Sequence, residues 1–227
     1  MKVLAINGSP RMNNGNTDLI LNPFLEGIRK GGANVELFYT RKLKIDPCTG
    51  DLFCWYNSPG KCHITDDMQL FYPKLYNTNI LVLATPVYAP LPGEMQNFIN
   101  RLIPIMNPIL EMRLNRTRAR LHKEVKISKI VLVSSCGWWE KGHFGTVIRI
   151  IKELAEDVSI EFSGALLRPH ADFLREDNEK TRNVLNAAKK AGYQIIKNGK
   201  ISPDLLNIVS CELISLEKYM KINNQVY

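Results

Sequence analysis

Residues 2–17 read KVLAINGSPRMNNGNT, and this stretch decides the fold. Its first six residues, Lys2–Asn7, form an apolar run of strand length, and a polar loop leads from them into an amphipathic helix predicted over Thr17–Lys30. Gly31 and Gly32 follow this helix as a stop signal. A strand, a short polar loop and a helix in this order are typical of an alternating β/α protein.

The same alternation continues along the chain. The runs Asn79–Thr85 and Lys129–Ser135 are mostly apolar, as expected of strands buried on both faces. The pattern predicts a doubly wound, five-stranded parallel sheet with helices on both faces. The predicted strands are Lys2–Asn7, Val35–Thr40, Asn79–Thr85, Lys129–Ser135 and Ile160–Leu167, and the predicted helices are Thr17–Lys30, Asp66–Tyr76, Gly93–Ile103, Val147–Ala155 and Asn178–Lys197. Pro73 is expected to break or kink the second helix.

The chain divides into a domain over residues 1–200 and a C-terminal extension over residues 201–227. The extension carries apolar residues at helical spacing, from Leu205 through Val209 to Leu216. We expect one extra helix, packed on the domain or on a partner subunit.

The loop after the first strand has the composition of a phosphate site. N–H groups at a helix N-terminus attract anions. Here hydroxyl and amide side chains add neutral donors, glycines allow close approach, and one arginine adds positive charge. Neither Gly-Lys-Ser/Thr nor Gly-x-Gly-x-x-Gly occurs in this loop, which favours a monophosphate held without magnesium. A polar turn that only caps the helix is the alternative. The predicted contacts are Ser9, Arg11, Asn14, Gly15, Asn16 and Thr17.

Two later loops have the composition of a pocket for a flat ring. In a doubly wound sheet the ligand lies beyond the carboxyl ends of the strands. The loop after the third strand is rigid and aromatic, and the loop after the fourth is rich in glycine and aromatic residues. We expect the first loop to offer backbone donors to the ring. The predicted contacts are Pro86, Val87, Tyr88, Ser135, Cys136, Gly137, His143 and Phe144. Each could also serve packing alone, so their convergence at one edge carries the prediction.

Three motifs together resemble the NADPH-dependent FMN reductase family. They are Gly8-Ser9-Pro10-Arg11 with Gly15-Asn16-Thr17, Ala84-Thr85-Pro86-Val87-Tyr88, and Phe98-Ile99-Asn100-Arg101. Cysteines before Asp66-Asp67-Met68 make the iron–sulfur flavoproteins the most similar members. The resemblance implies a flavodoxin-like fold, bound FMN, and a homo-oligomer, a dimer or tetramer, with active sites near subunit contacts.

The cysteine segment departs from the iron–sulfur flavoproteins. Their four-cysteine motif corresponds here to Cys48, Asp51, Cys54 and Cys62, with an aspartate as the second ligand. A carboxylate is a poorer ligand than a thiolate for iron in a sulfide cluster. We therefore expect no iron–sulfur cluster and no metal; the alternatives are a cluster completed by Asp51 or another group, and a zinc site with His63.

The predicted function is that of an FMN-dependent oxidoreductase. It would accept hydride from NADH or NADPH and pass electrons to a quinone, a flavin, a nitro compound, a metal ion or a protein. The flavin carries this chemistry, so we expect no catalytic acid or base among the side chains. The alternative is a non-enzymatic FMN electron carrier between protein partners.

Charge and composition limit the remaining partners. The net charge is +8, but most lysines and arginines are interleaved with acidic and apolar residues. The basic stretch Arg113–Lys129 is predicted to be a solvated excursion, with anion binding or a subunit contact as the alternative. We expect no nucleic-acid partner, no membrane contact and a cytoplasmic location.

Overall fold

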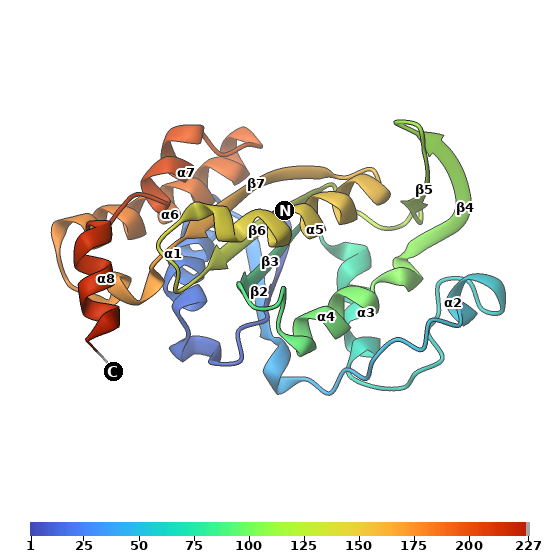
Figure 1. The fold of residues 1–227 in the computed structure, drawn as a ribbon. Helices are drawn as coiled ribbons and strands as arrows, with labels where there is room; N and C mark the ends of the chain where they lie inside the picture. The colour runs from blue at the N-terminus through green and yellow to red at the C-terminus, as the bar shows by residue number, and fades with distance from the viewer. Residues whose placement is uncertain (226–227) are drawn as a thin grey trace.

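The computed structural model describes residues 1–225, which form an α/β sandwich around one parallel sheet (Figure 1). The strands of this sheet are β1 (Lys2–Asn7), β2 (Asn34–Tyr39), β3 (Ile80–Pro86), β6 (Lys129–Ser135) and β7 (Glu161–Arg168). Their order is β2-β1-β3-β6-β7, and all neighbours are parallel. The predicted doubly wound, flavodoxin-like fold is confirmed, with strand ends within two residues of the prediction.

Helices cover both faces of the sheet. The α-helices are α1 (Asn16–Lys30), α2 (Phe53–Tyr56), α3 (Met68–Asn77), α4 (Gly93–Asn100), α5 (Gly145–Asp157), α6 (Glu179–Asn198), α7 (Pro203–Val209) and α8 (Leu216–Asn224). Short 3-10 helices are η1 (Met12–Asn14), η2 (Thr40–Lys42), η3 (Ile103–Ile105), η4 (Lys141–Phe144) and η5 (Ala171–Arg175). One apolar core lies under α1, α6 and α7, and a second lies under α3, α4 and α5.

Glycines allow α1 and α6 to pack closely. A Cβ atom at Gly192 would overlap the carbonyl oxygen of Phe24, and one at Gly27 would overlap that of Lys189. The two helix backbones therefore touch through a reciprocal pair of glycines. Side chains at these positions would separate the helices, because packed interiors leave no room for extra atoms.

Two helix predictions need correction. Pro73 lies inside α3 without ending it, because Pro73 is on the solvent side, where water can bond to the carbonyl that a proline leaves without a donor. The C-terminal extension contains two helices, α7 and α8, rather than one. The Ser210 hydroxyl donates to the carbonyl of Leu206 at the end of α7, and the Ser215 hydroxyl accepts from the N–H of Lys218 at the start of α8.

The basic stretch, predicted as a solvated excursion, forms much of an antiparallel hairpin. Its strands are β4 (Met106–Arg113) and β5 (Arg116–Leu121), which project beside α5 at the right of Figure 1. Arg118 is almost fully buried and donates to Asp157 (2.6 Å) and Glu156 (3.0 Å) at the end of α5. These ion pairs hold the hairpin against the domain.

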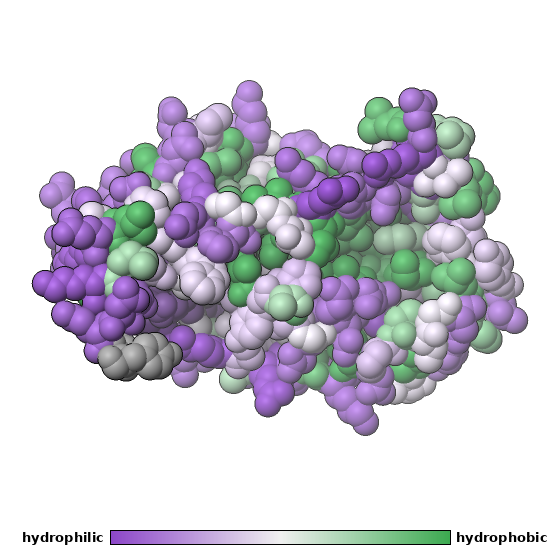
Figure 2. Space-filling view, in the orientation of Figure 1, coloured by the Kyte–Doolittle hydropathy of each residue, from purple (hydrophilic) through white to green (hydrophobic). Residues whose placement is uncertain are grey.

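The outer part of this hairpin exposes apolar side chains. Ile109, Leu110, Met112 and Leu114 are all exposed, and Figure 2 shows apolar surface in the hollow between the hairpin and the domain. Within residues 1–225 no helix is both long and apolar enough to cross a lipid bilayer.

Candidate functional site

A cavity of about 200 Å³ opens at the carboxyl ends of β1, β3 and β6. The strand order reverses between β1 and β3, and this is the position where doubly wound sheets bind ligands. Most of the predicted contacts line it together. The lining residues are Ser9, Pro10, Arg11, Asn16, Thr17, Pro86, Val87, Tyr88, Ser135, Cys136, Gly137 and Asp172. Asn14, Gly15, His143 and Phe144 do not line it.

The loop after β1 is shaped by its own side chains. The buried Asn7 amide accepts from the N–H of Ser9 (2.9 Å) and donates to Asp18 (3.1 Å) in the first turn of α1. The Gly8 N–H donates to Ala84 at the end of β3 (2.7 Å). Burial raises the pKa of the Asp18 carboxyl, which Tyr39 also contacts at 3.0 Å. These bonds connect the loop to both β3 and α1.

Gly15 is required by close packing inside this loop. A Cβ atom there would lie 2.5 Å from the Ser9 hydroxyl oxygen and 3.1 Å from the carbonyl oxygen of Met12. Gly15 therefore places the start of α1 directly against Ser9. The first N–H groups of a helix lack intrahelical acceptors, and Asn16 and Thr17, the first two residues of α1, line the cavity.

Two buried hydroxyls join the loop to β6. The side chains of Thr17 and Ser135 are 2.8 Å apart, and either hydroxyl can be the donor. Only one proton is used between them, so the other hydroxyl keeps a proton for a bound ligand. A helix N-terminus, two buried hydroxyls and the charge of Arg11 fit a monophosphate.

Asp172 and Arg175 of η5 also belong to this region, although no sequence motif indicates them. The Asn16 amide donates to Asp172 (2.7 Å), and Arg175 donates to the amide oxygen of Asn16 (3.0 Å) and to the carbonyl of Asn14 (2.7 Å). The side chain of Asn16 is thus already engaged at both ends. No local motif signals these contacts, because more than 150 residues separate the partners.

The loop after β3 forms one wall of the cavity but does not offer the expected backbone donors. The N–H of Val87 donates to Ser135 (2.8 Å), the N–H of Tyr88 donates to Pro90 (3.0 Å), and Pro86 has none. This expectation was wrong, since neighbouring carbonyls occupy both groups. The half-exposed ring of Tyr88 remains available as an apolar face.

The loop after β6 forms the opposite wall. Cys136 is buried, and burial raises the pKa of its thiol to about 11, so the thiol is protonated at neutral pH. His143 stacks on the exposed Trp138 with ring centroids 5.3 Å apart, outside the cavity lining. Phe144, another predicted contact, is fully buried and does not line the cavity.

The cysteine segment does not fit a metal cluster. Cys48 is exposed, Cys54 is buried, and burial together with the nearby Cys62 and Cys48 raises the pKa of the Cys54 thiol to about 11. The carboxylate of Asp51 accepts hydrogen bonds from the N–H of Phe53 and the hydroxyl of Thr49, both at 2.9 Å. The residues described form no group of three or more metal-ligand side chains.

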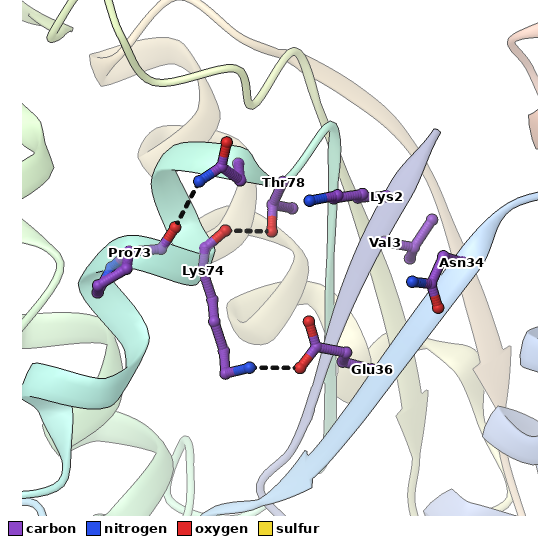
Figure 3. A pocket seen from close by; sticks show the side chains of 8 residues that line it. Lys2, Val3, Asn34, Glu36, Pro73, Lys74 and Thr78 are labelled. Carbon is purple, nitrogen blue, oxygen red and sulfur yellow. Dashed lines mark hydrogen bonds and ion pairs between the residues drawn. The ribbon is translucent and has the colours of Figure 1, made fainter.

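A second pocket lies at the opposite, amino-terminal edge of the sheet (Figure 3). The side chain of Lys74 donates to Glu36 at 2.5 Å, and the hydroxyl of Thr78 donates to the carbonyl of Lys74 at 2.8 Å. Its polar groups bond mainly to one another. It lies far from the strand ends that meet at the candidate site.

Sequence comparisons give a consistent set of similar proteins. A family model described as NADPH-dependent FMN reductase matches residues 1–151. An iron–sulfur flavoprotein of Methanocaldococcus jannaschii is 35% identical over 106 residues, covering 46% of this chain and 53% of the relative. One of Archaeoglobus fulgidus is 33% identical over 105 residues, covering 46% of each chain. The matched part thus spans about half the length of these relatives.

Solved structures share the fold at low sequence identity. A NAD(P)H:quinone oxidoreductase of Methanothermobacter marburgensis superposes with a TM-score of 0.59 at 14% identity, covering 86% of this chain and 96% of that one. An FMN-dependent NADH-azoreductase of Bacillus anthracis has a TM-score of 0.58 at 12% identity, covering 87% and 98%.

Proposed function

Because this chain belongs to the NADPH-dependent FMN reductase family, we propose that it is an FMN-dependent oxidoreductase that takes hydride from NADH or NADPH and reduces a separate acceptor. One observation carries the proposal. A single cavity joins the start of α1, a position where helices attract anions, to the loops after β3 and β6, and a phosphorylated flat ring requires this combination.

The phosphate end would be held by the loop after β1. The hydroxyls of Ser9 and Thr17 and the first N–H groups of α1 would donate to it, and Arg11 would add positive charge. The side chain of Asn16 would act indirectly, since Asp172 and Arg175 already hold it. Each hydrogen bond to a charged phosphate contributes roughly 1.5–3 kcal/mol.

The ring end would lie between the loops after β3 and β6. Tyr88 offers an apolar face on one side, and Cys136 and Gly137 line the other. Bound FMN would supply the two-electron redox chemistry. The thiol of Cys136 is protonated, and the carboxylate of Asp172 accepts a hydrogen bond from Asn16. These side chains would therefore bind and orient FMN rather than take part in the chemical step.

The acceptor is proposed to be a small molecule that reaches the open side of the cavity. Two structures with the same fold belong to a quinone oxidoreductase and an azoreductase. A quinone and an azo dye are therefore the first substrates to test. A flavin, a nitro compound, a metal ion and a protein are the acceptors to test next.

An anaerobic titration tests the proposal. The purified protein is loaded with FMN, separated from free FMN, and mixed with NADH or NADPH while the flavin absorbance is followed. Bleaching at catalytic rates, followed by reoxidation on adding a quinone, is the expected result. A protein that holds FMN but is not bleached by either nucleotide would favour the non-enzymatic electron carrier. A protein that takes up no FMN contradicts both functions.

We also propose that the protein is a homo-oligomer. The exposed apolar side chains of the hairpin, Ile109, Leu110, Met112 and Leu114, support this because large apolar patches mark contact surfaces. Light scattering on the eluted protein should give a mass at least twice the 25.9 kDa of one chain. A mass of one chain at working concentration contradicts it.

A further inference from the structure

Residues 136–139, which we term the cavity loop because Cys136 and Gly137 line the cavity, have all four of their carbonyl groups bonded to later parts of the chain. The carbonyl of Cys136 accepts from the N–H of Ala171 (3.0 Å), and that of Trp138 accepts from the N–H of His170 (2.7 Å). The carbonyl of Gly137 accepts from the hydroxyl of Tyr219 (3.0 Å).

The fourth carbonyl, that of Trp139, lies 3.3 Å from Nδ1 of His170. Nε2 of the same ring is 3.0 Å from the N–H of Leu213 and 3.0 Å from the guanidinium of Arg168. Both of these groups are donors, so Nε2 must be the acceptor and carries no proton. The proton therefore sits on Nδ1 and is donated to Trp139.

The C-terminal segment from Val209 to Tyr219, which we term the strap, is attached to the same place. Arg168 is fully buried and donates to the carbonyls of Val209 (2.9 Å) and Cys211 (2.5 Å). The indole N–H of Trp139 donates to the carbonyl of Ile214 (3.2 Å). The strap and the cavity loop are thus bonded to each other directly and through Arg168 and His170.

All four carbonyl oxygens of the cavity loop are bonded, three of them to His170 and Ala171 and one to Tyr219 of the strap. Gly137 is an exposed residue that lines the cavity, its N–H has no acceptor within residues 1–225, and open space surrounds the position where a Cβ would stand. A donor without a partner beside a cavity is free to bond to a ligand there.

We propose that the strap, through Tyr219 above all, positions the cavity loop so that the Gly137 N–H donates to bound FMN. Tyr219 is a positioning residue: it bonds to the carbonyl of Gly137 and does not line the cavity. This inference rests on the proposed function, because it takes FMN to be the ligand of the cavity.

The test compares wild type with Tyr219→Phe, which removes only the hydroxyl that bonds to Gly137. Folding is not at risk, because none of the residues of α8 is buried. Tyr193→Phe is the matched control, since Tyr193 lies on the surface of α6 and its hydroxyl has no hydrogen-bond partner within the part of the chain described. Three quantities are measured: the dissociation constant of FMN, the absorption and circular dichroism bands of bound FMN, and hydrogen exchange of residues 136–140 in the FMN-free protein.

Tyr219→Phe is expected to weaken FMN binding about three- to tenfold, as the loss of one ordinary hydrogen bond would. It should also shift the bands of the bound flavin and speed exchange of the cavity loop. Tyr193→Phe should match wild type in all three.

The outcomes that overturn the role of the strap differ from the one that overturns the proposed function. If wild type and Tyr219→Phe bind FMN equally and the bound flavin has identical bands, the role of the strap is overturned and the proposed function stands. Wild type that takes up no FMN overturns the proposed function, and this inference with it. Faster loop exchange in Tyr219→Phe without any change at the flavin also contradicts the inference, because the strap would then be structural only.

Discussion

At the scale of single residues, His170 carries a pH dependence whose direction follows from its contacts. It is almost fully buried, and burial, followed by the nearby charge of Arg168, lowers its pKa from 6.5 to about 4. The neutral form is favoured in the folded protein. Its contribution to stability is therefore fully present above pH 6.5 and is lost as the pH falls from 6.5 through 4.

At about 1.4 kcal/mol per pKa unit, we expect protonation of His170 to lower the free energy of unfolding by about 3 kcal/mol between pH 6.5 and 4. His170→Gln should flatten the fall in unfolding free energy between pH 6.5 and 4, measured by urea unfolding, whereas His63→Gln, at a half-exposed site, should not. An NMR titration that places the His170 pKa near 6.5 contradicts the assignment.

A second prediction at the residue scale concerns the effect of Gly15→Ala on FMN binding. Alanine there would bring a Cβ atom within 2.5 Å of the Ser9 hydroxyl, which must rotate away. Because Ser9 is proposed to donate to the phosphate, Gly15→Ala should weaken FMN binding about tenfold or more, as the loss of one charge-assisted bond would. Gly93→Ala, where a Cβ meets nothing within 4 Å, should bind FMN as wild type does. Equal affinities measured by fluorescence titration would falsify the role of Ser9.

At the scale of elements, the contact between α1 and α6 depends on its glycines. Gly192→Ala has two opposed effects. Alanine favours a helix over glycine by about 1 kcal/mol. The new Cβ would overlap the Phe24 backbone, and because a backbone atom cannot rotate away, the helices must move apart. Overpacking of this kind costs about 1–3 kcal/mol, and here it should be at the upper end.

We therefore expect Gly192→Ala to lower the free energy of unfolding by about 1–2 kcal/mol in urea melts. Gly145→Ala, at the start of α5 with no neighbouring atom, should be neutral or stabilising. A Gly192→Ala protein as stable as wild type would mean that α1 and α6 pack less closely than described.

At the scale of the whole molecule, ligand binding and folding are linked. A ligand that binds only the folded protein stabilises it by about 2.7 kcal/mol at one hundred times its dissociation constant. For a chain of this size each kcal/mol raises the melting temperature by roughly 2–4 °C, so FMN should raise it by about 5–10 °C.

Riboflavin is the control for this melting experiment, because it has the ring of FMN and no phosphate. At the same concentration it should produce a clearly smaller rise. Equal shifts would show that the loop after β1 is not used as a phosphate site. A rise with inorganic phosphate alone, competing with FMN, would support it.

The sequence by itself determined the parts of this protein that depend on local chemistry. The length of apolar runs such as Lys2–Asn7 and Lys129–Ser135, and their place between helical segments, favour strands of a buried sheet, and both strands are found with these bounds. Alternation with helices then requires the parallel, doubly wound arrangement, because a parallel connection needs a crossover. The loops that this arrangement brings to one edge were therefore predictable, and most of the predicted contacts line one cavity.

Only the tertiary structure decided which polar groups in that cavity are free. The N–H groups of Val87 and Tyr88 are used by neighbouring carbonyls, and the side chain of Asn16 is held by Asp172 and Arg175. Likewise, Tyr219 reaches the carbonyl of Gly137 from 82 residues away. Hydrogen bonds between distant segments leave no periodicity or spacing in the sequence, because their geometry exists only once the strands and helices are packed. Composition thus indicates the kind of site, and packing decides which of its atoms can bind a ligand.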